Sequence, residues 1–139
     1  MKTLALQKYI ISELYKGKVF AYECDQKYVY ISDCFRVWKV PYDVIFISLA
    51  EMKEAKVKRF LADGDKANIK FEEGFTEGFS RYRFGEVEGV KTFYDPKLLE
   101  FFEKFEMNKL DCDPRGPIFI KEEGEIVGMI MPVEGEENG

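Results

Sequence analysis

The sequence contains no histidine. Histidine is the side chain that titrates near neutral pH without help from its surroundings, and it is the commonest metal ligand in proteins. Its absence excludes Ser-His-Asp and Cys-His nucleophile arrangements, histidine general bases and the common zinc sites. We therefore expect a protein that is not an enzyme. A small enzyme that uses carboxylates or a thiolate is the weaker alternative.

Motifs for bound nucleotides and ions are also missing. The glycine-rich stretch 74–89 lacks both the lysine-serine ending of a P-loop and a G-x-G-x-x-G core. No acidic stretch has the spacing of a calcium-binding loop. The three cysteines, Cys24, Cys34 and Cys112, show no C-x-x-C spacing, and we expect reduced, partly buried thiols. The sequence therefore predicts no cofactor and no bound metal.

Long hydrophobic runs are absent as well. No stretch approaches the roughly 18 apolar residues that a membrane-spanning helix requires. The opening stretch, MKTLALQKYIISELYKG, continues as an amphipathic pattern and lacks the small-residue cleavage site of a secretion signal. We therefore expect a cytoplasmic protein that has no membrane partner.

The composition favours one folded domain. A chain of 139 residues is about one domain, and its 46% hydrophobic and 16% aromatic content excludes disorder for most of the length. The acidic, glycine-bearing residues 134–139 are the exception, and we expect a flexible tail there. The sequence thus predicts a single domain over residues 1–133.

The first forty residues predict a helix and three strands. Leu6 and Ile10 belong to one apolar stripe that runs between Thr3, a candidate N-cap, and Gly17, a candidate stop. This spacing predicts a helix over residues 3–16. Three short runs that are rich in β-branched and aromatic residues then predict strands over residues 19–24, 28–32 and 35–38.

The same order recurs at the other end of the chain. Asp95 is a good N-cap, and Pro96 suits the first position of a helix. Apolar residues follow at helical spacing, at positions 98, 101, 102 and 105, which predicts a helix over residues 95–106 with Phe102 and Phe105 in the core. Three strands are predicted to follow it, near 109–113, around Ile118 and Ile120, and over 126–131.

The middle of the chain is less regular. Residues 50–62 have a helical composition with an imperfect apolar face. Further strands are predicted over residues 67–71, 79–84 and 87–94, with glycines at the turns between them. The whole pattern predicts an α+β fold with a mainly antiparallel sheet, built from two similar halves that each consist of a helix followed by strands.

The segment 94–133 resembles the last half-domain of a bacterial DNA sliding clamp. In that family a helix that starts with Asp-Pro and carries paired leucines leads into a strand, then a Pro-apolar-Ile strand, then a terminal strand that ends in Met-Pro. The matching residues here are Asp95, Pro96, Leu98, Leu99, Pro117, Ile118, Ile120, Gly124, Met131 and Pro132. The resemblance implies a single DNA-clamp-like domain whose two halves are related by an approximate twofold axis.

The resemblance also implies a function by association. It points to a non-enzymatic binding module, an accessory factor in DNA replication or repair that acts through a homo-oligomer or through a replication or repair protein. In the clamp family the terminal Met-Pro strand borders a groove for partner peptides, which implies that Met131, Pro132 and Val133 bind a partner. The alternative is a regulatory or interaction protein, encoded on a mobile element, that binds no DNA.

One basic cluster is a candidate for contacts with DNA. Lys53, Lys56, Lys58 and Arg59 form the densest positive stretch, and on a helix three of them would share one face, which suits phosphates. Two glutamates are interleaved with them, so a solvated helix surface with ion pairs explains the same residues. Because the chain carries a net charge of −5, we expect DNA binding by a monomer to be weak or absent.

Overall fold

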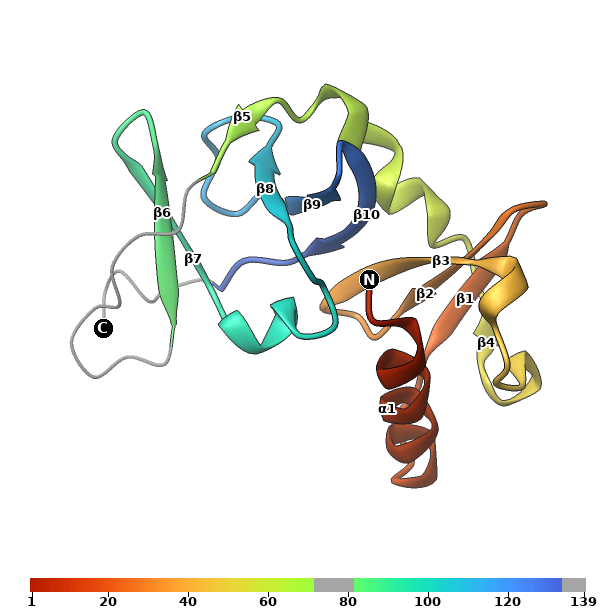
Figure 1. Ribbon diagram of the computed structural model, residues 1–139. Helices are drawn as coiled ribbons and strands as arrows, with labels where there is room; N and C mark the ends of the chain where they lie inside the picture. The colour runs from red at the N-terminus through yellow and green to blue at the C-terminus, as the bar shows by residue number, and fades with distance from the viewer. Residues whose placement is uncertain (72–81, 134–139) are drawn as a thin grey trace.

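The computed structural model describes residues 1–71 and 82–133, and the tail predicted at 134–139 lies outside them. The fold is α+β with a mainly antiparallel sheet (Figure 1). The helices, among which the η elements are 3-10 helices, are α1 (Thr3–Tyr15), η1 (Tyr42–Val44), η2 (Leu49–Glu51), η3 (Lys58–Lys66) and η4 (Pro96–Leu99). The strands are β1 (Ala21–Cys24), β2 (Tyr28–Ser32), β3 (Arg36–Pro41), β4 (Lys53–Glu54), β5 (Ile69–Lys70), β6 (Arg83–Val87), β7 (Val90–Tyr94), β8 (Glu106–Lys109), β9 (Ile118–Glu122) and β10 (Glu125–Ile130).

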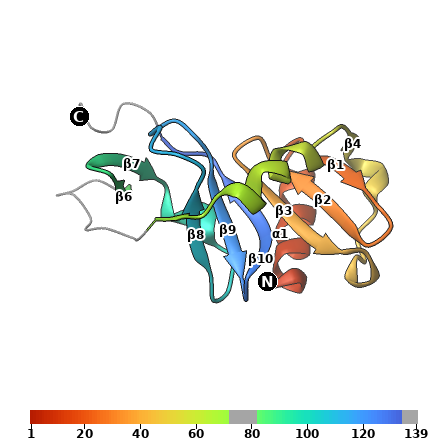
Figure 2. The same ribbon diagram turned by 90° about the horizontal axis from the view of Figure 1, so that it is seen from above.

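Eight strands form one sheet in the order β4-β1-β2-β3-β10-β9-β8-β5. Neighbouring strands are antiparallel except β1 and β4, which are parallel. β3 and β10 meet in the middle, where Trp38 is opposite Gly128. Figure 2 shows β1 and β2 beyond β3 on one side of this pair, β9 and β8 beyond β10 on the other, and the β6-β7 hairpin beyond β8.

The helix α1 covers one face of the sheet. Leu6 and Ile10 are fully buried in the core, as their spacing predicts. Gly17 follows the helix at φ +85°, a left-handed conformation that glycine adopts without strain. The helix predicted over residues 3–16 is therefore confirmed, although Lys2 and not Thr3 is the N-cap. No helix in the described part of the chain is long and apolar enough to cross a membrane.

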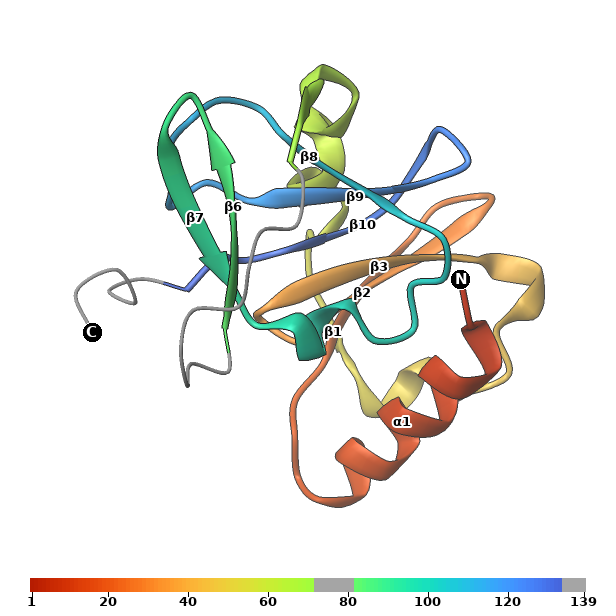
Figure 3. The ribbon, with the colours of Figure 1, turned by 60° about the vertical axis from the view of Figure 1, so that its left-hand side comes forward.

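The sheet is buried on both faces. Trp38 and Val40 point to the side of α1, where they join the larger hydrophobic cluster. Val37 points to the other side and packs with Leu61 of η3 and Met129 of β10. Figure 3 shows β2, β3 and β10 between α1 on one side and the segment that contains η3 on the other. Because side chains alternate along β3, this strand contributes to a hydrophobic cluster on each face of the sheet.

The helix predicted over residues 95–106 is wrong. Asp95 does cap a turn, because its carboxylate accepts the N–H of Lys97, but only the 3-10 turn η4 forms. The carbonyls of Lys97 and Leu98 accept the guanidinium of Arg36, and the carbonyl of Lys97 also accepts the N–H of Glu100 in a 3-10 bond, in place of the bonds that would continue an α-helix. The helical conformation ends at Glu100, whose ψ is 142°, and Phe101 then adopts φ +80°.

The aromatic residues after η4 still reach the core. Phe102 is buried and Phe105 is half-buried against the larger hydrophobic cluster. The predicted burial is confirmed for Phe102 and holds only in part for Phe105, and both residues lie in a non-helical segment and not on a helix face. Helical spacing of apolar residues therefore identified the side chains that are buried without identifying the backbone that carries them.

The helix predicted over residues 50–62 is also wrong. The segment begins with the short turn η2 and then extends as β4, because the N–H groups of Lys53 and Ala55 donate to carbonyls of Phe20 and Tyr22. The helical conformation returns only in η3, a 3-10 helix. Pairing with the edge strand β1 overrides the helical composition of this stretch.

Most predicted strands are present. The strand predicted over 28–32 is β2, and the one over 126–131 is β10, shifted by one residue. β1, β3, β5, β7 and β9 also overlap predicted strands, whereas part of the strand predicted over 79–84 lies outside the described residues. The strand predicted near 109–113 is wrong, since Asp111 and Asp113 accept backbone N–H groups in a turn.

All three cysteines are free thiols. The expectation that they are partly buried holds for Cys112 only. Cys24, at the end of β1, and Cys34, in the hairpin between β2 and β3, are exposed. Both lie where a strand gives way to a turn, which is why a residue type that usually favours the core is exposed here.

Candidate anion-binding cleft

A cleft lies on the face of the sheet opposite α1. Its floor is a row of side chains from neighbouring strands. Glu23 of β1 is opposite Tyr30 of β2, and Tyr30 is opposite Lys39 of β3. Ile126 of β10 extends the row. Because directly opposite residues point to the same face of a sheet, these side chains lie side by side.

The wall of the cleft above this floor is the segment that contains η3. Val57 and Leu61 are buried against the sheet and hold η3 in place. Gly64 allows a close approach to β10, because a Cβ added there would lie 2.9 Å from Cγ1 of Ile126. The cleft between sheet and segment has a volume of about 440 Å³, which is within the range of small-ligand sites.

Positive charge dominates the lining. Its charged side chains are four cations and two carboxylates: Lys39, Lys56, Lys58, Arg59, Glu23 and Asp65. This excess of cations is local, since the whole chain carries a net charge of −5. Within residues 1–71 and 82–133, Lys39, Lys56 and Arg59 form no ion pair. Three of the four cations are therefore available to an anionic ligand.

Lys58 is held differently. Its Nζ lies 3.0 Å from Oδ2 of Asp25, and its backbone N–H donates to Glu23. Asp25 also accepts the N–H groups of Lys27 and Tyr28 at the turn between β1 and β2. These N–H groups and the ammonium of Lys58 hold the pKa of Asp25 well below its usual range. The carboxylate thus stays charged and fixes the start of η3 to the hairpin.

Two tyrosines border the cations. The hydroxyl of Tyr30 donates to Asp25 at 3.1 Å, and burial together with this bond raises the pKa of Tyr30 above its usual range. The Nζ of Lys39 lies 4.1 Å from the ring centre of Tyr28, within the range of a cation–π contact. The cleft therefore combines cations with aromatic surface.

A second hollow adjoins the cleft. It has a volume of about 340 Å³ and is lined by Asp25, Gln26, Lys27, Tyr28, Tyr30 and Lys58. Tyr30 and Lys58 belong to both linings. The two hollows are therefore neighbours, and the second adds Lys27, an exposed lysine, to the cations already described.

The predicted DNA-binding residues fall into two groups. Lys56, Lys58 and Arg59 line the cleft together. Lys53 lies apart, on β4, because the stretch is not one helix and has no shared helix face. Lys39 was not predicted, since it comes from a strand distant in the sequence. The sequence hints at Lys39 only by alternation, because a lysine between the apolar residues Trp38 and Val40 of a strand points to the opposite face of the sheet.

The predicted partner-binding residues follow β10. The N–H of Met131 donates to the carbonyl of Phe35 in the hairpin between β2 and β3, and both side chains are exposed. Pro132 is half-buried. Val133 is also half-buried, and its N–H donates to the carbonyl of Phe93 in β7. Of the three, Met131 is the most exposed, at 36%.

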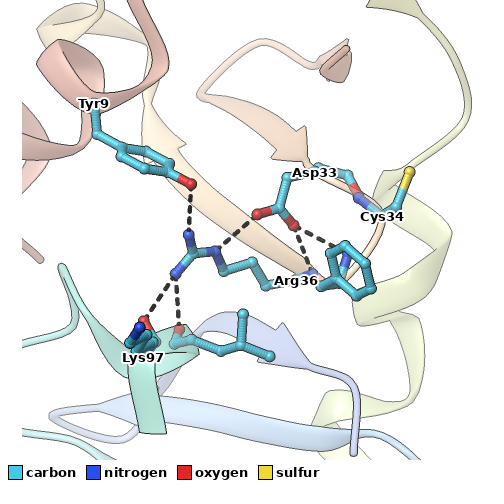
Figure 4. Close-up of polar contacts among 8 residues, drawn as sticks. Tyr9, Asp33, Cys34, Arg36 and Lys97 are labelled. Carbon is cyan, nitrogen blue, oxygen red and sulfur yellow. Dashed lines mark hydrogen bonds and ion pairs between the residues drawn. The ribbon is translucent and has the colours of Figure 1, made fainter. Parts of the chain in front are cut away.

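A second polar cluster, around Arg36, was not predicted (Figure 4). The guanidinium donates to Asp33, to the hydroxyl of Tyr9 and to the carbonyls of Lys97 and Leu98. The side chain is only 5% exposed, so its hydrogen-bonding capacity is used within the protein. Its chemistry is that of an anchor that joins α1, β3 and η4, and not of a ligand site.

No group of three or more histidine, cysteine, aspartate or glutamate side chains that could hold a metal ion occurs in residues 1–71 and 82–133. Comparisons with models of protein families, with curated proteins and with solved structures find no match to this chain. The function of the cleft must therefore be argued from its own chemistry.

Proposed function

We propose that this chain is a non-enzymatic module that binds the phosphate groups of a nucleic acid in the basic cleft. The observation that carries the proposal is the convergence of Lys39, Lys56 and Arg59, from two distant segments, on one concavity. Contacts of lysine and arginine with phosphates supply essentially all of the nonspecific affinity of proteins for nucleic acids. An anion bound in the cleft would also compete with few carboxylates of the protein for these three side chains.

A clamp-like arrangement of two halves is the architectural part of the proposal. Outward from the central pair, β3 and β10, the strands of both halves follow in the same order. α1 precedes the first trio, and η4 precedes the second. This order supports halves related by an approximate twofold axis, which the resemblance to sliding clamps implies.

The second half departs from the clamp pattern in its helix. In sliding clamps the helices line the hole that surrounds DNA, whereas η4 is a single 3-10 turn. A helix-lined surface would therefore be incomplete in this chain. For that reason the proposal assigns nucleic-acid contacts to the cleft, with a role in replication or repair that depends on self-association or on a protein partner.

The proposed affinity of one copy is low. Each phosphate contact contributes about 0.9 to the slope of log K against log salt for duplex DNA and about 0.7 for single strands. Three available cations thus predict a slope of about 2 to 3. The acidic net charge opposes the approach of a polyanion. Binding is expected at low ionic strength, and it would strengthen if several copies present their clefts together.

The test is a salt titration with a matched pair of variants. The first variant is Lys39→Gln, Lys56→Gln and Arg59→Gln. The control removes three exposed lysines on or beside α1: Lys2→Gln, Lys8→Gln and Lys18→Gln. Both triple variants have the same net charge, so a loss of general electrostatic attraction affects them equally. Binding of fluorescent DNA is measured from about 20 to 200 mM salt, and the native mass of each variant is determined.

The expected result is that the cleft variant loses most of the salt-dependent binding and that the control retains it. Equal losses would mean that net charge and not the cleft governs affinity. The absence of binding by the unmodified chain at the lowest salt concentration, at every oligomeric state observed, would overturn the proposal.

A second candidate function is self-association without nucleic acid. Exposed large hydrophobic residues lie on α1, just after it, and in the segment whose backbone bonds to Gln7 of α1: Leu4, Ile11, Tyr15, Val19, Val44 and Phe46. Exposed apolar side chains that gather in one region favour an interface. This function would be favoured if the unmodified chain has a native mass above that of a monomer and the double variant Ile11→Ser and Phe46→Ser has the mass of a monomer. An unchanged monomer would count against it.

A further inference from the structure

The two hollows adjoin each other. We call the cleft and the second hollow together the track, because Tyr30 and Lys58 line both of them. Along this track the available cations are Lys27 at one end and Lys56 with Arg59 at the other. Lys39 lies between the two tyrosines, since it is opposite Tyr30 in the sheet and its Nζ is 4.1 Å from the Tyr28 ring centre.

The walls of the track suit bases as well as phosphates. Tyr28 borders the second hollow, and Tyr30, Leu61 and Ile126 border the first. Aromatic and apolar surface adds nothing for a ligand that offers phosphates alone. Proteins that bind single strands without sequence preference combine a basic groove with aromatic side chains on which bases stack. The track has both components.

A duplex cannot use these walls. Its bases are paired and stacked inside the helix, so it presents phosphates on a convex surface. The segment with η3 stands over the floor of the cleft, and a rigid duplex would reach only the exposed cations at the rim. A single strand is flexible enough to turn a base toward Tyr28 while its phosphates contact Lys39 and Lys56.

We infer that the track binds single-stranded nucleic acid in preference to duplex, with a base against Tyr28 and the backbone along Lys39, Lys56 and Arg59. This inference rests on the proposed function, because it names the form of nucleic acid that the same cleft takes. Lys58 acts mainly through position, since Asp25 already neutralises its charge.

The experiment compares three ligands with the unmodified protein at low salt. They are a fluorescent mixed-sequence strand of about twelve nucleotides, the duplex of the same sequence, and the same strand without bases. We expect the strand to bind at least tenfold more tightly than the duplex. Loss of the bases should weaken binding by about tenfold or more, since stacking on an aromatic side chain contributes about 1–3 kcal/mol per base.

Two variants test the role of the ring. Tyr28→Leu keeps an apolar side chain and removes the aromatic face, and it should weaken binding of the strand by about fivefold or more. Tyr15→Leu is the control, because Tyr15 is 93% exposed on α1, away from the track. Thermal unfolding of both variants verifies that they are folded. If Tyr28→Leu does not fold, the strand without bases still tests the inference.

The outcomes separate the inference from the proposed function. Equal affinity for strand and duplex, or for strands with and without bases, would overturn the inference and leave the proposed function standing. Equal effects of Tyr28→Leu and Tyr15→Leu would also overturn it. No binding of any of the three ligands would overturn the proposed function and the inference together.

Discussion

The guanidinium of Arg36 lies 4.4 Å from the ring centre of Trp38, two positions further along β3. Both side chains are on the α1 side of the sheet, where Phe101 and Tyr9 complete the surroundings of the cation. A buried cation is tolerated only when hydrogen bonds and charge satisfy it. Here Asp33 supplies the charge, at 3.0 Å.

Loss of the Arg36 side chain should therefore be costly. Arg36→Met would remove the ion pair with Asp33 and the guanidinium donors to the carbonyls of Lys97 and Leu98, and we expect the free energy of unfolding to fall by about 3–5 kcal/mol. Urea unfolding measures the change. Arg115→Met is the control, because that side chain is 73% exposed, and its effect should stay within about 0.5 kcal/mol. A loss below about 1 kcal/mol for Arg36→Met would contradict the anchoring role.

The central strand pair requires a glycine. A Cβ added to Gly128 would lie 2.6 Å from the carbonyl oxygen of Val37 and 2.6 Å from Cζ of Phe102. The ring has little room to yield because it is buried, and the carbonyl belongs to the neighbouring strand. We expect Gly128→Ala to lower the free energy of unfolding by about 1–3 kcal/mol. Gly116→Ala, whose nearest contact would be 3.4 Å, should have a smaller effect in the same denaturation assay.

The ring of Phe102 contributes to the same region. It is 5% exposed, so Phe102→Ala should lower the free energy of unfolding by about 3–5 kcal/mol, as is typical of large-to-small changes in a core. Phe60→Ala is a suitable comparison, since Phe60 is 44% exposed. If chemical denaturation shows similar small losses for both variants, the packing of Phe102 against Gly128 is not important for stability.

Helices and strands whose conformation is determined by residues close in the sequence could be predicted from the sequence. The stripe that contains Leu6 and Ile10 is a helix because both side chains pack on the sheet, and the short apolar run of β10 is a buried strand. Asp95 was also identified correctly as a cap. In each of these cases neighbouring residues determine the structure.

The two helix errors have distant causes. The carbonyls after Pro96 bond to Arg36, which is some sixty positions earlier in the sequence. The extension of Lys53 depends on pairing with the chain at Phe20. Neither partner can be identified from composition or from local spacing. A sequence alone shows which residues prefer a helix and not which backbone groups a distant side chain will take.

The residues of the cleft show the same difference between local and distant causes. Lys56, Lys58 and Arg59 are close in sequence, and their association could be predicted. Lys39 could not, because its place in the cleft depends on the register of β2 and β3, in which Tyr30 is opposite Lys39. Register follows from the hydrophobic pattern and turn geometry together. The sequence therefore identified part of the cationic lining but not the concavity.

Asp25 should make stability depend on pH in the acid range. Its pKa is lowered from 3.8 in the folded chain by the backbone N–H of Lys27, the ammonium of Lys58 and the N–H of Tyr28. Its contribution is therefore present above the unfolded pKa, near 3.8, and is lost as the pH falls through the folded pKa. Asp25→Asn keeps the turn acceptor and removes the charge.

The measurement compares unfolding of the unmodified chain and Asp25→Asn between pH 7 and pH 2. The variant should be less stable at pH 7, and the difference should shrink below about pH 4. Asp111→Asn, a turn carboxylate far from Lys58, serves as the control. A difference between Asp25→Asn and the unmodified chain that stays constant over the whole range would show that the charge of Asp25 contributes nothing.

The α-amino group of Met1 should make the stability of the fold depend on pH in the opposite direction. Its nitrogen lies 2.7 Å from Glu122 and 3.2 Å from Glu103. Burial alone would lower its pKa, but the hydrogen bonds to Glu122 and Glu103 outweigh burial and raise the pKa above 8.0. A raised pKa contributes stability that is complete below the unfolded value, near 8.0, and is lost as the pH rises through the folded value.

Glu122→Gln tests this contribution, because it removes the nearer charge and keeps the shape of the side chain. The variant should be less stable than the unmodified chain at pH 7, and the difference should diminish above pH 8 as the amine loses its proton. Glu123→Gln, an exposed neighbour in the turn before β10, should show no such convergence. Parallel stability curves for Glu122→Gln and Glu123→Gln from pH 7 to pH 10 would therefore mean that the ion pair at Met1 does not stabilise the fold.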